Sequence, residues 1–332
     1  MNKIDFVIAW VDGSDPKHQA KRAQYSGQNV SAEAMLSTRF ASDDEIYFSI
    51  ASILKYVPYC GKIYVVTDQQ KPLFLDEFSK QGICEVDQIQ VVDHTILFQE
   101  FNEYLPTFNS LTIETMLWRI PQLTKHFIYL NDDFFFNAPS KITDFLENDQ
   151  QKIYGHWKSN TLVKAKHNYR LILQKYFGKA MQPKYTFAQM LSAELVGLDR
   201  YYEIHHRPHM LSHELFKEYF GQNLELMKKQ ISHRFRSADQ FLPVGLNNHL
   251  GVSKNNVTLE ADLEIAYLKN EHGVSEFLSK IQTDSIKFGC IQSLDEFDGL
   301  NAKKVKDAMI SKFDDFLPDS VKAKPREGIN ES

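Results

Sequence analysis

A short apolar segment followed by two acidic residues constrains the fold of this chain more than any other feature. Phe127-Ile128-Tyr129-Leu130 is rich in strand-forming residues and has no polar face, and Asn131-Asp132-Asp133 follows directly. Such a segment predicts a strand buried on both faces of a parallel sheet, and open α/β sheets bind ligands where such strands end. Adjacent residues of an extended chain point to opposite faces. Either the chain turns so that Asp132 and Asp133 hold one ion together, or one of them fixes the loop.

Three earlier apolar runs repeat this arrangement. Residues 3–11 end at Asp12-Gly13-Ser14-Asp15, residues 62–67 end at Asp68, and residues 82–92 also precede an acidic residue. Helical patterns alternate with these runs, which predicts an α/β fold with a mostly parallel sheet and with the polar strand ends at one edge. The 12–15 segment then has two interpretations, a ligand loop with exposed amides or a turn that caps the next helix.

Three charged residues lie on predicted helices. Glu45 follows Ser42 by three residues at the start of an apolar helical pattern, so it is either the partner in a capping box or a catalytic residue. Glu114 and Arg119 lie on the helix expected before residue 127. Their positions alone indicate surface or pairing roles.

Composition narrows the classes of function. A formal net charge of −5 argues against nucleic-acid binding, which usually requires a strongly basic face. No apolar run approaches the roughly 20 residues that span a bilayer, and the first residues lack a signal-peptide pattern, so we expect a cytoplasmic protein. Cys60, Cys84 and Cys290 have no metal-ligand spacing, which predicts reduced thiols and argues against a zinc site.

The chain changes character after Pro139. We expect residues 1–145 to form the N-terminal α/β core with the ligand site, residues 146–230 a mainly helical insertion that covers this site, residues 231–320 a return to the core with a C-terminal helix, and residues 321–332 a tail. Basic side chains of the insertion suit an anionic acceptor, and a charged run is also typical of a solvated helix face. These side chains are Lys164, Lys166, His167, Arg170 and Lys175.

Two polar clusters follow in the C-terminal half. His205-His206-Arg207-Pro208-His209 holds three imidazoles and a guanidinium, but Pro208 is unfavourable for helical metal-ligand spacing. A general base or a phosphate ligand is the better interpretation of this cluster. His233-Arg234-Phe235-Arg236 supplies two guanidinium groups, whose fork of donors fits the oxygens of a diphosphate.

Together these segments resemble the Stealth family of sugar-1-phosphate transferases, which includes bacterial capsular polysaccharide phosphotransferases and the catalytic subunit of the lysosomal-enzyme N-acetylglucosamine-1-phosphotransferase. The resemblance spans nearly the whole chain, in four blocks that follow the family's order. The blocks are residues 5–16; Arg39-Phe40 with Glu45 and residues 62–68; Phe108-Asn109-Ser110 with Glu114, Arg119 and Asn131-Asp132-Asp133; and Arg207-Pro208-His209 with His233-Arg234-Phe235-Arg236.

The resemblance implies a fold, a reaction and a cofactor. The fold is a Rossmann-like, modified nucleotide-sugar-transferase core, and the cofactor is Mg²⁺ or Mn²⁺. The reaction moves a hexose- or N-acetylhexosamine-1-phosphate from a UDP- or GDP-sugar to a glycan hydroxyl, which forms a phosphodiester and releases UMP or GMP during capsular or surface polysaccharide synthesis. The implied acceptor is an oligosaccharide or a lipid-linked glycan, met at the inner face of the membrane by peripheral association.

The same resemblance implies roles for individual residues. His206 or His209 would be the base, with Glu45 as a second candidate, and Arg236 would hold the phosphates together with Arg39. Asp132 or Asp133 would bind the ion through oxygen, and Asp133 is preferred because the aromatic run behind it holds it at the end of the strand. The remaining substrate-binding candidates are Asp12, Gly13, Ser14, Asp15, Asp68, Asn109, Glu114, Arg119, Asn131, Arg207, His233 and Arg234.

The chain departs from the family pattern at two places. Tyr47 stands where many members have an arginine after the matching glutamate, and Gln292-Ser293 stands where many have Asn-Asp, so no role is carried over for that late acidic position. Two other functions suit the same residues, a metal-dependent glycosyltransferase that releases UDP or GDP and a non-catalytic glycan-binding protein. The sequence leaves open the sugar, the nucleotide, the acceptor hydroxyl and the oligomeric state.

Overall fold

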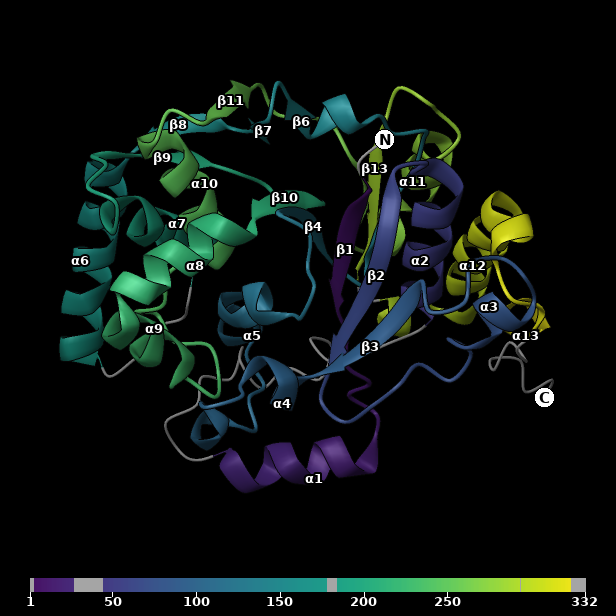
Figure 1. Ribbon diagram of the computed structural model, residues 1–332, viewed down its shortest axis with the longest axis horizontal. Helices are drawn as coiled ribbons and strands as arrows, with labels where there is room; N and C mark the ends of the chain where they lie inside the picture. The colour runs from purple at the N-terminus through teal and green to yellow at the C-terminus, as the bar shows by residue number, and fades with distance from the viewer. Residues whose placement is uncertain (1–2, 27–43, 178–183, 293, 324–332) are drawn as a thin grey trace.

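The computed structural model describes residues 3–26, 44–177, 184–292 and 294–323, and it is built around a five-stranded sheet (Figure 1). The strand order is β10-β4-β1-β2-β3, in which β4, β1, β2 and β3 are parallel and β10 is antiparallel to β4. The order of the four parallel strands is that of a Rossmann-like half, so the predicted α/β class with a mostly parallel sheet is confirmed. The strands are β1 (Ile4–Ala9), β2 (Cys60–Thr67), β3 (Ile89–Asp93), β4 (His126–Asn131) and β10 (His209–Ser212).

Helices cover both faces of this sheet (Figure 1). Successive residues of a strand point to opposite faces, and β1 shows the consequence. Phe6 and Ile8 belong to an apolar cluster with α2 (Glu45–Tyr56), α11 (Val274–Lys280) and α12 (Gly299–Phe313). Val7, between them, belongs to a second cluster with α5 (Ser110–Met116), α8 (His213–Gln222) and α10 (Pro243–Ser253). The sheet is therefore buried on both sides, as its uninterrupted apolar strands predict.

A second, three-stranded sheet continues from the end of β4. It has the order β12-β13-β5 and consists of β5 (Phe134–Phe136), β12 (Ala266–Leu268) and β13 (Phe288–Ile291). Gly289 lies opposite Phe135, and any side chain at Gly289 would overlap the Phe135 ring. Because β5 packs so closely on β13, the Asp132-Asp133 turn between β4 and β5 is held at the junction of two sheets.

The segment 146–230 contains strands as well as helices. It holds β6 (Leu146–Glu147), β7 (Gln150–Tyr154), β8 (His156–Ser159), α6 (Asn160–Phe177), α7 (Tyr185–Glu194) and β9 (Arg200–Glu203). It then returns to the central sheet through β10, which the sequence pattern did not predict, and His209 of β10 faces Tyr129 of β4. Two helices follow β10, α8 and α9 (Leu224–Ile231), and they meet at Asn223.

The remaining elements are short or peripheral. They are α1 (Pro16–Tyr25), α3 (Glu77–Lys80), α4 (His94–Leu97), β11 (Val257–Glu260), which pairs with β7, and α13 (Asp319–Ala323). The helix that follows the Asp12–Asp15 loop, α1, ends at Tyr25. In the part of the chain that the structure describes, no helix is both long and apolar enough to cross a membrane.

Candidate active site

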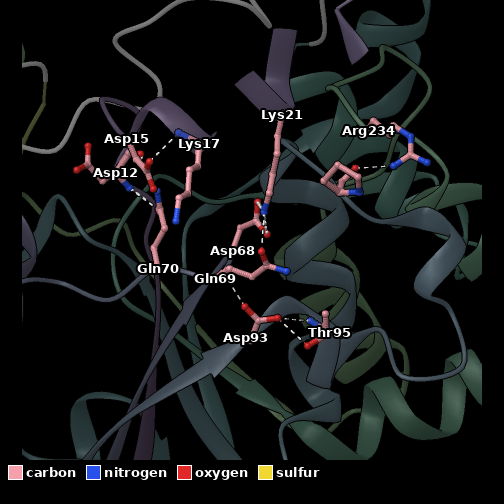
Figure 2. Close-up of polar contacts among 11 residues, drawn as sticks. Asp12, Asp15, Lys17, Lys21, Asp68, Gln69, Gln70, Asp93, Thr95 and Arg234 are labelled. Atoms are coloured by element: carbon pink, nitrogen blue, oxygen red, sulfur yellow. Dashed lines mark hydrogen bonds and ion pairs between the residues drawn. The ribbon is translucent and has the colours of Figure 1, made fainter. Parts of the chain in front are cut away.

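The loops after β1 and β2 form a polar network whose members bond to one another (Figure 2). Asp12 accepts hydrogen bonds from the Ser14 backbone N–H at 2.8 Å and from its hydroxyl at 2.6 Å. Asp15 caps α1 by accepting from the Lys17 N–H at 2.8 Å. Gln70 joins the loops by donating to the Asp12 carbonyl and the Asp15 carboxylate, both at 3.0 Å, and its bond to Asp15 is the main reason that the Asp15 pKa is lowered. The capping interpretation of this segment is confirmed.

The carboxylates at the next two strand ends are satisfied in the same way, whereas Thr67 Oγ1 and the ring nitrogens of His94 are buried there without partners. Lys21 Nζ lies 3.1 Å from both carboxylate oxygens of Asp68 and 3.1 Å from Gln69 Oε1. Asp93 accepts from the Gln69 N–H at 2.6 Å and from the Thr95 N–H and hydroxyl at 2.9 and 2.6 Å. This network explains the positions of Asp68, Gly13 and Ser14 without a ligand. Contact of any of the three with a ligand therefore stays a prediction.

The end of β4 differs, because it opens into a pocket. The pocket lies between α5, the start of α7, the β4–β10 pair and residues 236–244. It brings together six of the residues singled out in the sequence, which are Glu114, Asn131, His206, Arg207, His209 and Arg236. The third and fourth blocks of the sequence thus meet at one site although residues 134–206 lie between them.

Arg236 and Glu114 dominate the charge of this pocket. Arg236 donates a hydrogen bond to Ser110 Oγ at 2.6 Å, the one hydrogen bond of its side chain among the described residues. Glu114 is only 7% exposed, and its Oε2 has no hydrogen-bond partner. Burial raises the pKa of Glu114 to about 7, although the Arg236 charge and hydrogen bonds with Ser110 and Tyr129 act in the opposite direction.

The two candidate histidines are neutral in the free protein. The His206 ring stacks on Tyr185 with 4.1 Å between ring centroids, and desolvation, followed by the charges of Arg236 and His205, lowers the His206 pKa to about 4. Burial, followed by Arg207 and His206, holds the pKa of His209 well below its ordinary value. His209 Nε2 has no hydrogen-bond partner. Both rings therefore keep a lone pair that is able to accept a proton.

A group of carboxylates lies beside the pocket, at the turn after β4. Burial, and then the charges of Asp133 and Glu45, hold the pKa of Asp132 well above its ordinary value, and burial raises the pKa of Asp133 to about 6. Asp133 Oδ2 accepts from Cys290 Sγ at 3.4 Å, and Asp133 Oδ1 is buried without a partner. An orphaned oxygen among mutually repelling carboxylates fits a hard divalent cation such as Mg²⁺.

The geometry of this turn decides how many of these carboxylates are able to bind one ion. The chain turns at Asp132 and Asp133, so the alternating geometry of a strand no longer separates them. Ligand atoms of Asp132, Asp133 and Glu45 do not all lie within 4.8 Å of one another, so an ion would take one or two of them and complete its shell with other oxygens. The capping-box interpretation of Glu45 is wrong, since Asp44 is the N-cap and Glu45 is the first residue of α2.

Several predicted residues lie outside the pocket lining. Asn109 caps α5 and donates to the His233 carbonyl at 2.9 Å. Arg234 donates to the Pro106, Glu103 and Tyr104 carbonyls at 2.7, 3.1 and 3.3 Å, and Arg119 donates to the Gln99 carbonyl at 2.7 Å. Their substrate-binding roles stay predictions. Arg39 lies outside the described residues.

Two tyrosines of the pocket were not identified as site residues from the sequence. Tyr129 donates to Asn131 Oδ1 at 2.7 Å, and burial raises the pKa values of both Tyr129 and Tyr185. Tyr129 is indistinguishable from the other core residues of its strand, and Tyr185 is the first residue of α7, with no motif around it. Only the stacking of Tyr185 on His206 reveals that it belongs to the site.

Two family models and several known proteins are similar to parts of this chain. Residues 2–30 match Stealth protein CR1, conserved region 1, and residues 39–154 match Stealth protein CR2, conserved region 2. Capsular polysaccharide phosphotransferase cps1A of Actinobacillus pleuropneumoniae is 39% identical over 165 residues, which cover 48% of this chain and 43% of the relative. Receptor polysaccharide phosphotransferase WefC of Streptococcus oralis is 42% identical over 151 residues, which cover 45% of this chain and 43% of the relative. Each match thus spans less than half of the relative's length.

Among solved structures, the apo form of the bifunctional glycosyltransferase WbbM is similar over 94% of this chain and 50% of its own, with 11% identity and a TM-score of 0.44. The sequence matches cover the strands and turns from β1 to β7, including the Asp12–Asp15 loop, Glu45, Glu114 and the Asp132-Asp133 turn. The resemblance to the Stealth family is therefore confirmed over residues 2–30 and 39–154, which are similar to Stealth conserved regions 1 and 2.

Proposed function

We propose that this chain transfers a sugar-1-phosphate from a nucleotide sugar to a glycan hydroxyl. The observation that supports this most is the pocket at the end of β4, where Arg236 keeps most of its donors available beside two neutral histidines. Transfer of a phosphoryl group requires that charge on the phosphate oxygens is stabilised and that the acceptor hydroxyl loses its proton. The names of the relatives, which are polysaccharide phosphotransferases, support the same class of reaction.

In this proposal Arg236 binds the diphosphate of a UDP- or GDP-sugar. Its guanidinium is held by Ser110 through one bond, so the remaining N–H groups are available to phosphate oxygens in a fork geometry. Arg207 forms another part of the wall, where its guanidinium lies 4.8 Å from the centre of the Tyr154 ring. Attack at the phosphorus attached to the sugar forms the phosphodiester and releases UMP or GMP.

His206 or His209 accepts the proton of the acceptor hydroxyl. A pKa near 4 is low for a general base, but it belongs to the pocket without substrate, where the positive charge of Arg236 faces His206. A bound diphosphate reverses the sign of that local charge and raises the His206 pKa toward neutrality. Glu114 is a second candidate, because its pKa of about 7 already suits proton transfer at neutral pH.

Asp132 or Asp133 would hold Mg²⁺ or Mn²⁺, since the orphaned Asp133 Oδ1 needs a positive partner. Such an ion would stabilise the negative charge that develops on the nucleotide phosphate as it leaves. The chain's own contribution at this turn is positional, because the Ile291 N–H donates to the Asp133 carbonyl at 2.9 Å and fixes the turn on β13.

The acceptor, an oligosaccharide or a lipid-linked glycan of a surface polysaccharide, enters in this proposal from the side of α6. A hollow of about 640 Å³ lies there, lined by Lys158, Lys166, His167 and Arg170, and it shares Lys184 and Ala238 with the pocket. His167 stacks on Phe187 with 3.6 Å between centroids, which gives the hollow an aromatic wall beside its cations. The side chain of Lys175 lies outside the described residues.

The released nucleotide tests the proposal. Purified protein, Mg²⁺, a UDP- or GDP-sugar and a glycan acceptor are expected to yield UMP or GMP, measured by ion-pair chromatography. UDP or GDP as the sole nucleotide product would instead identify a metal-dependent glycosyltransferase. Binding of the glycan without turnover over a panel of donors would identify a non-catalytic glycan-binding protein.

A further inference from the structure

A cluster of two histidines and an aspartate lies on the surface next to the pocket but outside its lining. His156 begins β8, His205 lies between β9 and β10, and Asp262 follows β11. One ligand atom from each residue lies within 4.8 Å of the other two. Among the described residues this is the one group of three or more His, Cys, Asp or Glu side chains that converges in this way.

The distances in this cluster are close to those around a metal ion. Asp262 Oδ2 is hydrogen-bonded to His156 Nδ1 at 2.7 Å and lies 3.7 Å from His205 Nε2, which is too long for a hydrogen bond. Ligands bound at about 2.1 Å around a tetrahedral zinc ion lie about 3.4 Å apart, between these two values. Small side-chain movements would therefore place all three atoms around one ion.

A second carboxylate, that of Glu203, orients the His156 ring. Its Nε2 lies 3.1 Å from Glu203 Oε2, whose side chain is only 6% exposed. Glu203 is also paired with Lys158 and hydrogen-bonded by Tyr201, so it is fixed in place. Metal-binding histidines commonly bond a carboxylate through the nitrogen that does not bind the metal, and this arrangement fixes the ring. Here it turns His156 Nδ1 toward Asp262 and His205.

The backbone allows this approach at one glycine. Gly155 lies between β7 and β8, and a side chain there would overlap the Glu203 carbonyl. Because Gly155 has none, β9 packs directly on the β7–β8 corner, which brings Glu203 beside His156.

We propose that His156, His205 and Asp262 form a binding site for a first-row transition-metal ion of the Zn²⁺ type, with Glu203 orienting His156. Two imidazoles and one carboxylate are ligands that Zn²⁺ accepts, whereas Mg²⁺ prefers oxygen ligands alone. The ion would join β8, the β9–β10 connection and the loop after β11, directly beside His206 and Arg207 of the pocket. This site is separate from the Asp132-Asp133 turn.

Calorimetric titration of the chelator-treated protein with Zn²⁺, without donor or acceptor and with Mg²⁺ present to occupy the carboxylates of the Asp132-Asp133 turn, tests this inference. We expect one site, and we expect His156→Gln, His205→Gln and Asp262→Asn each to weaken binding by at least about tenfold. Glu203→Gln is expected to weaken it by about tenfold as well. His272→Gln, which removes an exposed histidine from the 3₁₀ turn 271–273, is the matched control and should bind as the wild type does.

Co²⁺ provides a second readout, since a four-coordinate site with imidazole ligands gives intense visible absorption that aqueous Co²⁺ lacks. We expect that band in the wild type, its loss in His205→Gln, and no displacement by a tenfold excess of Mg²⁺. Absence of one-site Zn²⁺ binding, equal affinity in all variants, or displacement by Mg²⁺ would each overturn the assignment. None of these readouts depends on turnover, so failure of the metal site and failure of the proposed transfer reaction remain distinguishable.

Discussion

The two halves of the sheet's ligand edge differ in how completely their carboxylates are hydrogen-bonded. After β1, β2 and β3, the carboxylates of Asp12, Asp15, Asp68 and Asp93 all accept hydrogen bonds from the chain itself, and Figure 2 shows the bonds of the last three. Around the end of β4, Asp133 Oδ1 and Glu114 Oε2 are buried without partners, as is His209 Nε2 of β10. The first half also holds buried polar atoms without partners, but they are Thr67 Oγ1 and the two ring nitrogens of His94, not carboxylate oxygens. Buried polar atoms without partners are costly, and proteins keep few of them. The difference indicates that the first half is built to hold the loops and that the second half awaits a ligand.

The largest effect is expected from Arg236, the cation of the unsatisfied half. Arg236→Ala should lower the rate of transfer by about 10³-fold, because a donor to developing phosphate charge is lost. Steady-state assay of nucleotide release measures this change, with the thermal unfolding temperature as the check on folding. Arg234→Ala is the matched comparison, since Arg234 already donates to three carbonyls. If Arg234→Ala loses more turnover than Arg236→Ala at equal stability, Arg234 and not Arg236 is the residue that stabilises the phosphate charge.

The unsatisfied half should also make folding pH-dependent through Glu114. Its pKa is raised from 4.5 to about 7 in the folded chain, so this group's stabilising contribution is complete below about pH 4.5 and is lost as the pH rises through 7. Over that window the free energy of unfolding of the wild type falls by about 3 kcal/mol. Glu114→Gln has no carboxyl group to titrate and does not show this fall. In urea unfolding, the stability of the variant relative to the wild type should therefore rise by about 2 to 3 kcal/mol between pH 5 and pH 8.

Glu225→Gln is the control for that measurement, because Glu225 is a surface partner of Lys228 with 86% of its side chain exposed. A pH profile of Glu114→Gln that parallels the wild type would mean that Glu114 is not the group that holds the extra proton.

The histidines should separate catalysis from binding. His206→Ala and His209→Ala are each expected to lower turnover by about 10²-fold while the affinity for the nucleotide sugar changes little, as loss of a general base requires. Single-turnover rates and equilibrium donor binding measure the two quantities separately. Equal losses of rate and affinity would assign the histidine to ligand binding.

The smallest effect is expected in the satisfied half. Lys21→Met removes the partner of Asp68, in a pair whose side chains are 30% and 9% exposed, and should cost about 1 kcal/mol of stability. Turnover should fall by less than about threefold, since Lys21 bonds only to Asp68 and Gln69 at this edge. A loss of 10²-fold with intact folding would show that this half also handles substrate.

The sequence predicts the core of this fold well because buried parallel strands have a strong pattern. Residues 3–11, 62–67 and 127–130 are predominantly apolar runs, and each contains a strand of the central sheet. β10 was not predicted, because four residues next to a histidine-rich segment carry no periodicity. The capping role of Glu45 was wrong because the helix begins one residue after Asp44, which only the backbone decides.

The types of the candidate site residues were predictable from the sequence, but whether each side chain has a hydrogen-bond partner was not. Chemistry-bearing residues such as Arg236, His206 and Asp133 are visible as motifs, whereas the sequence does not tell a satisfied carboxylate from an orphaned one. Asp68 and Asp133 both end apolar strands, yet Asp68 has Lys21 and one oxygen of Asp133 has no partner. Likewise, His156, His205 and Asp262 come from three distant segments, so no spacing rule predicts their convergence.

Phosphorus NMR of the reaction with a nucleotide sugar and a glycan acceptor tests the central claim most directly. The comparison uses two matched substitutions at strand ends of the same sheet, Asp133→Asn in the unsatisfied half and Asp93→Asn in the satisfied half. We predict a phosphodiester resonance at wild-type rate in Asp93→Asn and none, or a rate lower by at least about 10²-fold, in Asp133→Asn. A phosphodiester formed at wild-type rate by Asp133→Asn, with loss in Asp93→Asn, would contradict the account.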